Sequence, residues 1–163
     1  MRSPAHPVVV GVDGSDRSVD ALRWAGAEAA ARGCPLVAVL ACGDLPLTAP
    51  YAPVAVAGTP RPPADRLAEL VGVAFGGTPP VPVDEVCDPR RPVPALLAHG
   101  TGATLLVLAT SPEPPPAHPH SARNTAGSTA LALVKHAPCP VVLLPVSRHH
   151  PTNTPGPAAL ASA

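Results

Sequence analysis

Short apolar runs recur along the chain, and each is too brief to be a helix. Residues 8–12 hold four valines around Gly11, and residues 35–41, 103–109 and 141–146 are almost wholly apolar. Runs of this length are typical of strands buried on both faces of a parallel sheet. Residues 81–86 alternate apolar and polar positions and contain Pro82, which predicts a partly exposed edge strand. The pattern therefore predicts five strands.

Helical spacing of apolar residues fills the intervals between these strands. It predicts helices over residues 16–32, 65–75, 92–99 and 125–136. The last of these helices is expected to bury Ala130, Leu131 and Val134. Strands that alternate with helices predict right-handed crossovers, and so a doubly wound α/β sandwich with helices on both faces of a parallel sheet.

Proline-rich segments divide the chain around this pattern. Residues 43–64 predict a long surface loop, and residues 111–120 hold five prolines, which exclude a helix and favour an extended conformation. We expect residues 1–6 to be an N-terminal extension, residues 7–147 to form one domain, and residues 148–163 to be a disordered tail rich in Pro and Ala.

Composition excludes several classes of partner. The 163 residues carry no formal net charge, and only 2% of them are aromatic, so neither a basic surface nor a stacking platform for nucleic acid is expected. No apolar run approaches the length of a membrane span. The four cysteines form no close pair, and no export signal is evident. We therefore expect reduced cysteines, no metal site and a cytoplasmic protein.

A pair of histidines and the single lysine give no support to a metal site or to two classes of phosphate-handling protein. His118 and His120 lie two residues apart, but no carboxylate or Cys accompanies them, so they are interpreted as loop residues in solvent. Lys135 is the only lysine, which argues against a P-loop enzyme or a receiver-type phosphoacceptor.

The candidate site begins where the first strand ends. Asp13-Gly14-Ser15 follows the valine run and precedes a helix, and binding sites of open α/β sheets lie at such strand ends. Gly11 leaves room for a close approach to the backbone. Asp13 is interpreted either as a pocket residue or as a turn residue. Ser15, Asp16 or Ser18 can cap the following helix, and the sequence does not choose among them.

Both ends of the pattern resemble the universal stress protein family. Val8-Val9-Val10-Gly11-Val12-Asp13-Gly14-Ser15, followed by Ala21-Leu22-Arg23-Trp24-Ala25, is similar to the opening of that family. Gly127-Ser128-Thr129-Ala130, followed by His136-Ala137-Pro138-Cys139-Pro140-Val141-Val142-Leu143-Leu144-Pro145, is similar to its end. The resemblance implies a five-stranded parallel sheet in the order 3-2-1-4-5 and a homodimer paired through the fifth strands.

The resemblance also implies an adenine-nucleotide site. In nucleotide-binding members, an Asp at the end of the first strand and the end of the second strand lie beside adenosine. A Gly-x-x-Gly after the fourth strand and a later Gly-Ser or Gly-Thr cradle the ribose and phosphates, because glycines admit phosphates to backbone N–H groups. The corresponding positions here are Gly11, Val12, Asp13, Ala41, Ala109, Gly127, Ser128 and Thr129.

The first half of the phosphate motif departs from the family pattern. Ala109-Thr110-Ser111-Pro112 stands where the family has Gly-x-x-Gly, and the segment before Gly127 is longer than the family spacing. Pro112 has no N–H to donate to a phosphate. The leading hypothesis is a non-catalytic cytoplasmic stress-response protein with a remodelled or lost ATP pocket. The alternatives are an adenine-nucleotide sensor that binds ATP or AMP, and a slow nucleotide hydrolase with Asp13 as its only evident base.

Overall fold

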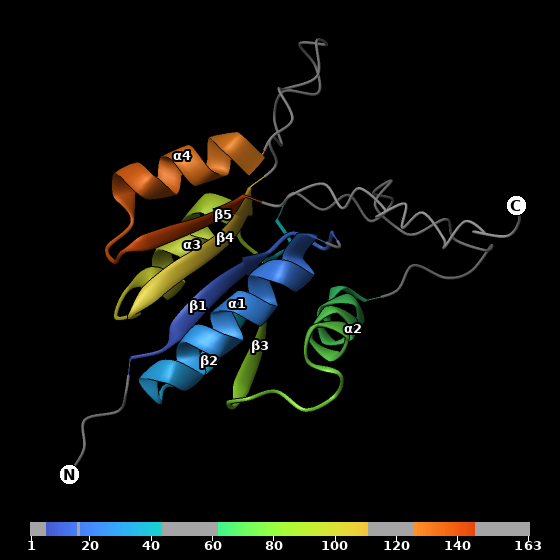
Figure 1. Cartoon of the computed structure of the whole chain (residues 1–163). Helices are drawn as coiled ribbons and strands as arrows, with labels where there is room; N and C mark the ends of the chain where they lie inside the picture. The colour runs from blue at the N-terminus through green and yellow to red at the C-terminus, as the bar shows by residue number, and fades with distance from the viewer. Residues whose placement is uncertain (1–5, 16, 44–61, 111–125, 146–163) are drawn as a thin grey trace, which may run out of the picture.

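The computed structural model describes residues 6–15, 17–43, 62–110 and 126–145 (Figure 1). Strands and helices alternate throughout this part of the chain. In chain order they are β1 (Val8–Val12), α1 (Arg17–Arg32), β2 (Leu36–Ala41), α2 (Pro63–Phe75), β3 (Val83–Asp88), α3 (Pro92–Gly100), β4 (Leu105–Thr110), α4 (Ala126–His136) and β5 (Val141–Pro145).

The strands form one parallel sheet in the order β3-β2-β1-β4-β5. This order confirms the doubly wound α/β fold and the order implied by the family resemblance. Helices α1 and α2 cover one face of the sheet, and α3 and α4 cover the other (Figure 1). The strand order reverses between β1 and β4, which defines the switch point of the fold.

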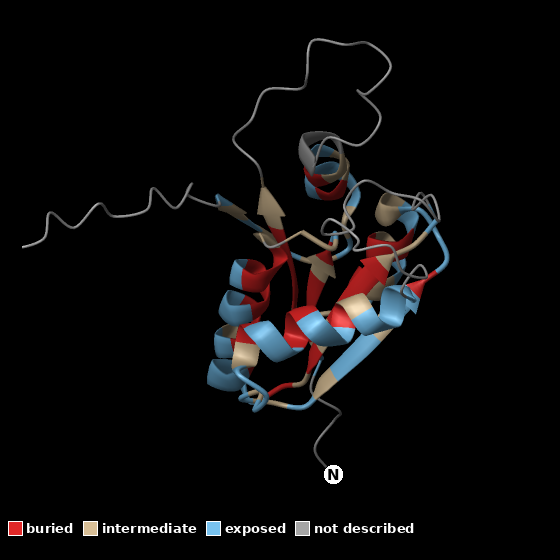
Figure 2. Ribbon diagram, turned by 90° about the vertical axis from the view of Figure 1, so that its right-hand side faces the viewer, coloured by how far each residue is buried: buried red, intermediate tan, exposed pale blue. Residues whose placement is uncertain are grey.

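Two hydrophobic clusters, one on each face, hold the sheet to its helices. Along β1, Val8 and Val10 point to the α1–α2 face and Val9 to the α3–α4 face, as the two-residue period of a strand requires. All three are essentially inaccessible to solvent. Figure 2 shows this buried centre of the sheet, with the edge strand β3 much more exposed. The predicted partly exposed edge strand is thus confirmed.

Several element boundaries differ from the sequence-based expectation. Helix α2 begins two residues earlier than predicted, at Pro63, because proline fits the first turn, where no backbone N–H is needed. Strand β3 lies two residues later than predicted, because Val83 is the first residue to pair with β2 and Pro82 lacks an N–H for the ladder.

The predicted inner face of α4 is wrong at two positions. Leu133 is fully buried and Ala130 nearly so, whereas Leu131 and Val134 are each 56% exposed. The apolar residues of α4 surround much of the helix, so their spacing alone did not determine which stripe packs on the sheet. Together with Leu143 on β5, which is 38% exposed, Leu131 and Val134 leave apolar surface at this end of the sheet.

The predictions for most of residues 43–64, for residues 111–120 and for the tail lie outside the described residues. Within the described ranges, no helix is long and apolar enough to cross a bilayer.

Candidate functional site

The strand register brings the sequence-predicted residues of β1, β2 and β4 to the carboxyl edge of the sheet. Val12 pairs with Leu40 of β2, and Gly11 pairs with Leu108 of β4. If the register is continued, Asp13 lies level with Ala41, one residue beyond Leu40, and with Thr110, two residues beyond Leu108. These three residues therefore reach the same edge. This edge flanks the switch point between β1 and β4, where open α/β sheets bind their ligands.

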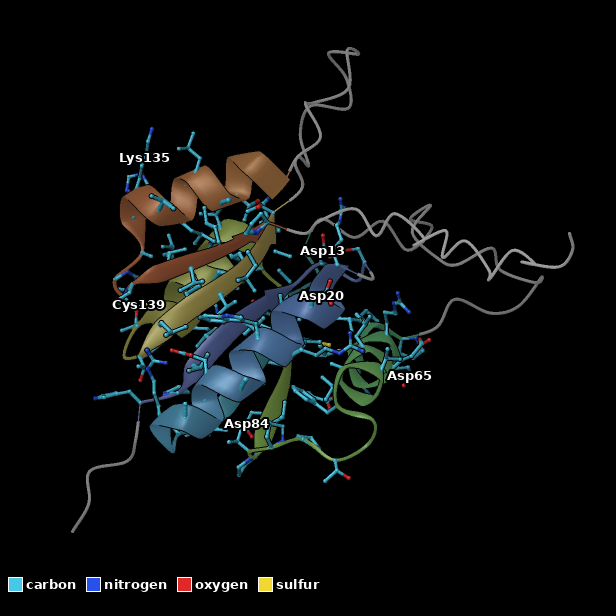
Figure 3. The ribbon with its side chains drawn as sticks, viewed as in Figure 1. Asp13, Asp20, Asp65, Asp84, Lys135 and Cys139 are labelled. Atoms are coloured by element: carbon cyan, nitrogen blue, oxygen red, sulfur yellow. The ribbon has the colours of Figure 1, made fainter. Side chains whose placement is uncertain are left out.

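Ser15 and Ser18 fix Asp13 in place, and the hydrogen bonds that they donate all reach the same oxygen of its carboxylate. Its Oδ1 accepts the backbone N–H of Ser15 at 3.0 Å, the Ser15 hydroxyl at 2.5 Å and the Ser18 hydroxyl at 2.8 Å. The backbone N–H of Asp13 in turn donates to the Ser18 hydroxyl at 3.1 Å. None of these hydrogen bonds uses Oδ2. Asp13 is thus both a turn residue and a carboxylate held at the rim of the sheet (Figure 3).

The electrostatics of this loop keep Asp13 ionised. Asp13 is partly exposed to solvent, but the protein atoms packed around its carboxylate remove some of its water, and this desolvation alone would raise the pKa of Asp13. The hydrogen bonds from Ser15 and Ser18, together with the charge of Arg17, outweigh this effect and lower the pKa below 3.8. An anionic acceptor with a low pKa suits the binding of hydroxyl or amino groups, and it is a weak general base.

The turn after β1 is fastened to α2 by an arginine. Gly14 has φ +83°, a backbone conformation that favours glycine, and its carbonyl oxygen accepts Nε of Arg66 at 3.1 Å and Nη2 at 2.8 Å. Arg66 also forms an ion pair with Glu69 at 3.2 Å. Sequence analysis did not identify Arg66, because the contact spans 52 positions and no local motif signals it.

Gly11 and Val12 serve the packing under the site. A Cβ on Gly11 would lie 2.6 Å from Cδ2 of Leu108 and 3.1 Å from Cδ1 of Leu96. The missing side chain of Gly11 therefore allows two core leucines to pack closely against its backbone. Val12 is only 5% exposed and belongs to the core cluster on the α1–α2 face. Both residues therefore lie beneath the rim, where their backbones support Asp13.

The remaining predicted positions lie on β4 and on the first turn of α4. Ala109 is half-buried beside the α1–α2 cluster, and the next residue, Thr110, donates its hydroxyl to the Leu144 carbonyl at 3.3 Å. Gly127, Ser128 and Thr129 belong to the first turn of α4, which begins at the carboxyl end of the sheet because β4 and β5 are parallel. Thr129 is half-buried.

A second carboxylate at the same edge was missed by sequence analysis. Asp88 ends β3, pairs in register with Ala41, and is only 4% exposed. It accepts the backbone N–H of Arg90 at 2.9 Å, the Arg90 guanidinium at 2.9 and 2.5 Å, and is 3.0 Å from Nε2 of His99. Asp88-Pro89-Arg90 forms the same kind of turn as Asp13-Gly14-Ser15, in which the Asp carboxylate accepts the backbone N–H two residues later. An Asp at the end of a predicted strand is thus the sequence signal that could have identified Asp88.

The cluster of Asp88, Arg90 and His99 has a structural role, because it links the end of β3 to α3. Hydrogen bonds from Arg90 and then from His99 outweigh the opposing effect of burial and hold the pKa of Asp88 far below 3.8. The carboxylate is therefore saturated by its neighbours, and it closes the end of β3 against α3. Among the described residues, no group of three His, Cys, Asp or Glu side chains is placed to hold a metal ion.

Several solved structures similar to this chain are universal stress proteins. One, in complex with cAMP, has a TM-score of 0.58 and 24% identity, covering 89% of this chain and all of the other. A second, from Archaeoglobus fulgidus, has a TM-score of 0.57 and 21% identity over 85% of this chain and 97% of the other. A third, from Archaeoglobus fulgidus in complex with dAMP, has a TM-score of 0.56 and 19% identity over 86% of this chain and 98% of the other.

At these identities, the structural matches establish the fold alone. None of the proteins with curated descriptions matches the sequence. The sequence pattern of the universal stress protein family, however, matches residues 4–145, which include every strand and helix described above. The chain therefore belongs to the universal stress protein family.

Proposed function

We propose that the chain is a non-catalytic, cytoplasmic stress-response protein that binds an adenine nucleotide mainly through its adenosine half. The observation that carries this proposal is the Asp13 carboxylate at the switch point, which Ser15 and Ser18 hold in place through Oδ1. Its carboxylate can accept a hydrogen bond from a hydroxyl or amino group of adenosine. Ala41, beside it at the end of β2, offers a small apolar surface for the base.

The phosphate half of the pocket is remodelled under this proposal. Ala109 carries a Cβ and Pro112 lacks an N–H at positions where the family uses glycines. The first turn of α4, with Gly127 and Ser128, supplies a helix N-terminus that attracts an anion. Lys135, the only lysine in the sequence, lies in the last turn of α4, at the opposite end of that helix (Figure 3). One phosphate thus has a binding contact, whereas further phosphates gain little.

The solved relatives support an adenine monophosphate as the ligand class. Two of them were solved in complex with cAMP and with dAMP, and each of these ligands joins an adenine nucleoside to a single phosphate. The lowered pKa of Asp13 supports a binding rather than a catalytic role, because a strongly held carboxylate is a poor proton acceptor.

The proposal includes a homodimer formed through the β5 edge. Strand β5 has no charged residue, and Leu143 on it is 38% exposed. Leu131 and Val134 on α4 are each 56% exposed, so a second copy would cover apolar side chains as well as an unpaired strand edge. The free thiols of the four cysteines support a reducing compartment such as the cytoplasm.

Nucleotide binding by matched variants tests the proposed function. Mass spectrometry of the gently purified protein is expected to detect a co-purified adenine nucleotide. Asp13→Asn and Asp13→Ala should weaken AMP binding by about tenfold, or about 1.4 kcal/mol, as expected for a lost hydrogen bond to a charged group. Asp84→Ala is the control, because Asp84 is exposed on β3 and lies away from this edge (Figure 3). Unchanged AMP affinity in folded Asp13 variants would contradict the proposal.

A further inference from the structure

Two cysteines are brought together at the carboxyl ends of β2 and β3. The ladder between these strands continues past Ala41, because the backbone N–H of Cys42 donates to the Asp88 carbonyl at 2.7 Å and that of Gly43 to the Arg90 carbonyl at 3.1 Å. Leu40 pairs with Cys87. Side chains alternate along a strand, so Cys42 projects from the same face as Leu40 and Cys87, one diagonal step from Cys87.

The two thiols have different access to solvent. Cys42 is half-buried against the cluster on the α1–α2 face and donates to the Leu40 carbonyl at 3.5 Å, whereas Cys87 is exposed on the edge strand. Burial, followed by the charge and hydrogen bonding of the neighbouring Cys87 thiol, raises the pKa of Cys42. An oxidant from solvent therefore meets Cys87 first, and Cys42 is the protonated neighbour behind it. Sequence analysis expected all four cysteines to be reduced and did not pair these two, which are 45 positions apart in the chain.

We propose that Cys42 and Cys87 are an oxidation site, which hydrogen peroxide converts into a disulfide across the ends of β2 and β3. The Cys87 thiolate attacks the peroxide oxygen, the O–O bond breaks, and Cys87 becomes a sulfenic acid while the second oxygen leaves as hydroxide or water. The Cys42 thiol, on losing its proton, then attacks the Cys87 sulfur, and the S–O bond breaks to release water. Two thiols are oxidised and one peroxide is reduced to two waters.

Formation of this disulfide requires a local movement of the backbone. Strand spacing and rise place diagonal Cα atoms about 8 Å apart in a flat sheet, whereas disulfides span about 4.4–6.8 Å. Cys42 lies one residue beyond the last residue of β2, so its movement toward β3 strains its own hydrogen bond to the Asp88 carbonyl but leaves the pairs from Leu36 to Ala41 in place. Gly43 resists this movement, because its Cα packs so closely on the Arg90–Arg91 backbone that a Cβ there would lie 2.6 Å from the Arg90 carbonyl carbon.

The movement would be transmitted to Ala41, the residue before Cys42. This consequence rests on the proposed function, in which Ala41 contacts adenosine. Oxidation should therefore weaken AMP binding several-fold, and reduction by a thiol reagent should restore it.

Peptide mapping tests the oxidation site independently of nucleotide binding. The full chain carrying Cys34→Ala and Cys139→Ala would be treated with hydrogen peroxide, blocked with N-ethylmaleimide, denatured and digested with trypsin. Residues 33–66 and 67–90 should then be recovered as one disulfide-linked pair, because Arg61 precedes Pro62 and is not cleaved. Cys42→Ser, with Cys42→Ala as a second version, should instead accumulate a sulfenic acid on Cys87 that dimedone traps several-fold more than in the parent.

Three results would overturn the proposal: both cysteines still alkylated by maleimide after peroxide, over-oxidation of Cys87 while Cys42 stays a thiol, or a disulfide that joins two chains on a non-reducing gel. AMP titration of the reduced and oxidised protein separates the two claims. If the linked peptides form but neither state binds AMP, the oxidation site stands and the proposed nucleotide function fails.

Discussion

The packing around Gly11 yields a prediction whose size can be worked out from the structure. Gly11→Ala places a Cβ 2.6 Å from Leu108 Cδ2, with Leu96 atoms at 3.1 and 3.2 Å on the other side. Leu108 and Leu96 are 7% and 4% exposed, so neither can move into solvent. Overpacking of this kind costs about 1–3 kcal/mol, and replacing a strand glycine with alanine returns about 0.5–1 kcal/mol. We expect a net destabilisation of about 1–2 kcal/mol.

Gly72→Ala is the matched control for Gly11→Ala. Gly72 lies inside α2, is exposed, and has no atom within 4 Å of the position that a Cβ would occupy, so this substitution should stabilise the protein by about 0.5–1 kcal/mol. Thermal unfolding should show Gly11→Ala melting about 2–8 °C lower than the parent and Gly72→Ala slightly higher. Adding Leu108→Val to Gly11→Ala should cost less than the two single changes combined. Equal or greater stability of Gly11→Ala would refute the reasoning.

Three other predictions follow from the same contacts. Arg66→Ala removes two hydrogen bonds to the Gly14 carbonyl and should lower the free energy of unfolding by about 1 kcal/mol, with faster hydrogen exchange confined to the turn after β1. An unchanged exchange rate in that turn would contradict a stabilising role for these hydrogen bonds. Because the pKa of Asp88 lies far below 3.8 in the folded protein, its contribution to stability is present above about pH 4 and is lost as the pH falls toward the folded pKa. In urea titrations, Asp88→Asn should therefore be less stable than the parent at neutral pH and should lose less stability as the pH is lowered. An unaltered dependence of stability on pH would contradict this. Leu143→Lys should shift sedimentation toward monomer, whereas Val73→Lys, at an even more exposed apolar position on α2, should not. A parent protein that is monomeric at tens of micromolar would rule out the dimer.

Much of the fold could be predicted because apolar runs and the helical spacing of apolar residues are local signals. The valines of β1 and the alternation of β3 identified a buried and an edge strand correctly, since burial on two faces or one leaves a direct imprint on the sequence. Helix α4 shows the limit. Leu131, Leu133 and Val134 are all apolar, and only packing against the sheet determined that Leu133 is the buried one.

The candidate site was harder to predict from the sequence than the fold, because its contacts join segments that are distant in the chain. Asp13 was found from its place at a strand end, but the partner role of Ser18 was hidden behind its aptitude as a helix cap. Arg66 reaches Gly14 from helix α2, and His99 reaches Asp88 from the last turn of α3. Gly11 was correctly expected to allow a close approach, yet only the register of β1 with β4 reveals that Leu108 makes it.

Titration calorimetry with AMP and with ATP tests the central claim, that adenosine rather than phosphate dominates binding at the β1–β4 switch point. The account predicts that both nucleotides bind with affinities within about tenfold of each other, a difference of at most about 1.4 kcal/mol, and that Asp13→Asn weakens both by a similar factor. Asp84→Ala, titrated in parallel, should match the parent. Binding of ATP about a hundredfold tighter than AMP, or equal affinities for the parent and Asp13→Asn, would contradict the account.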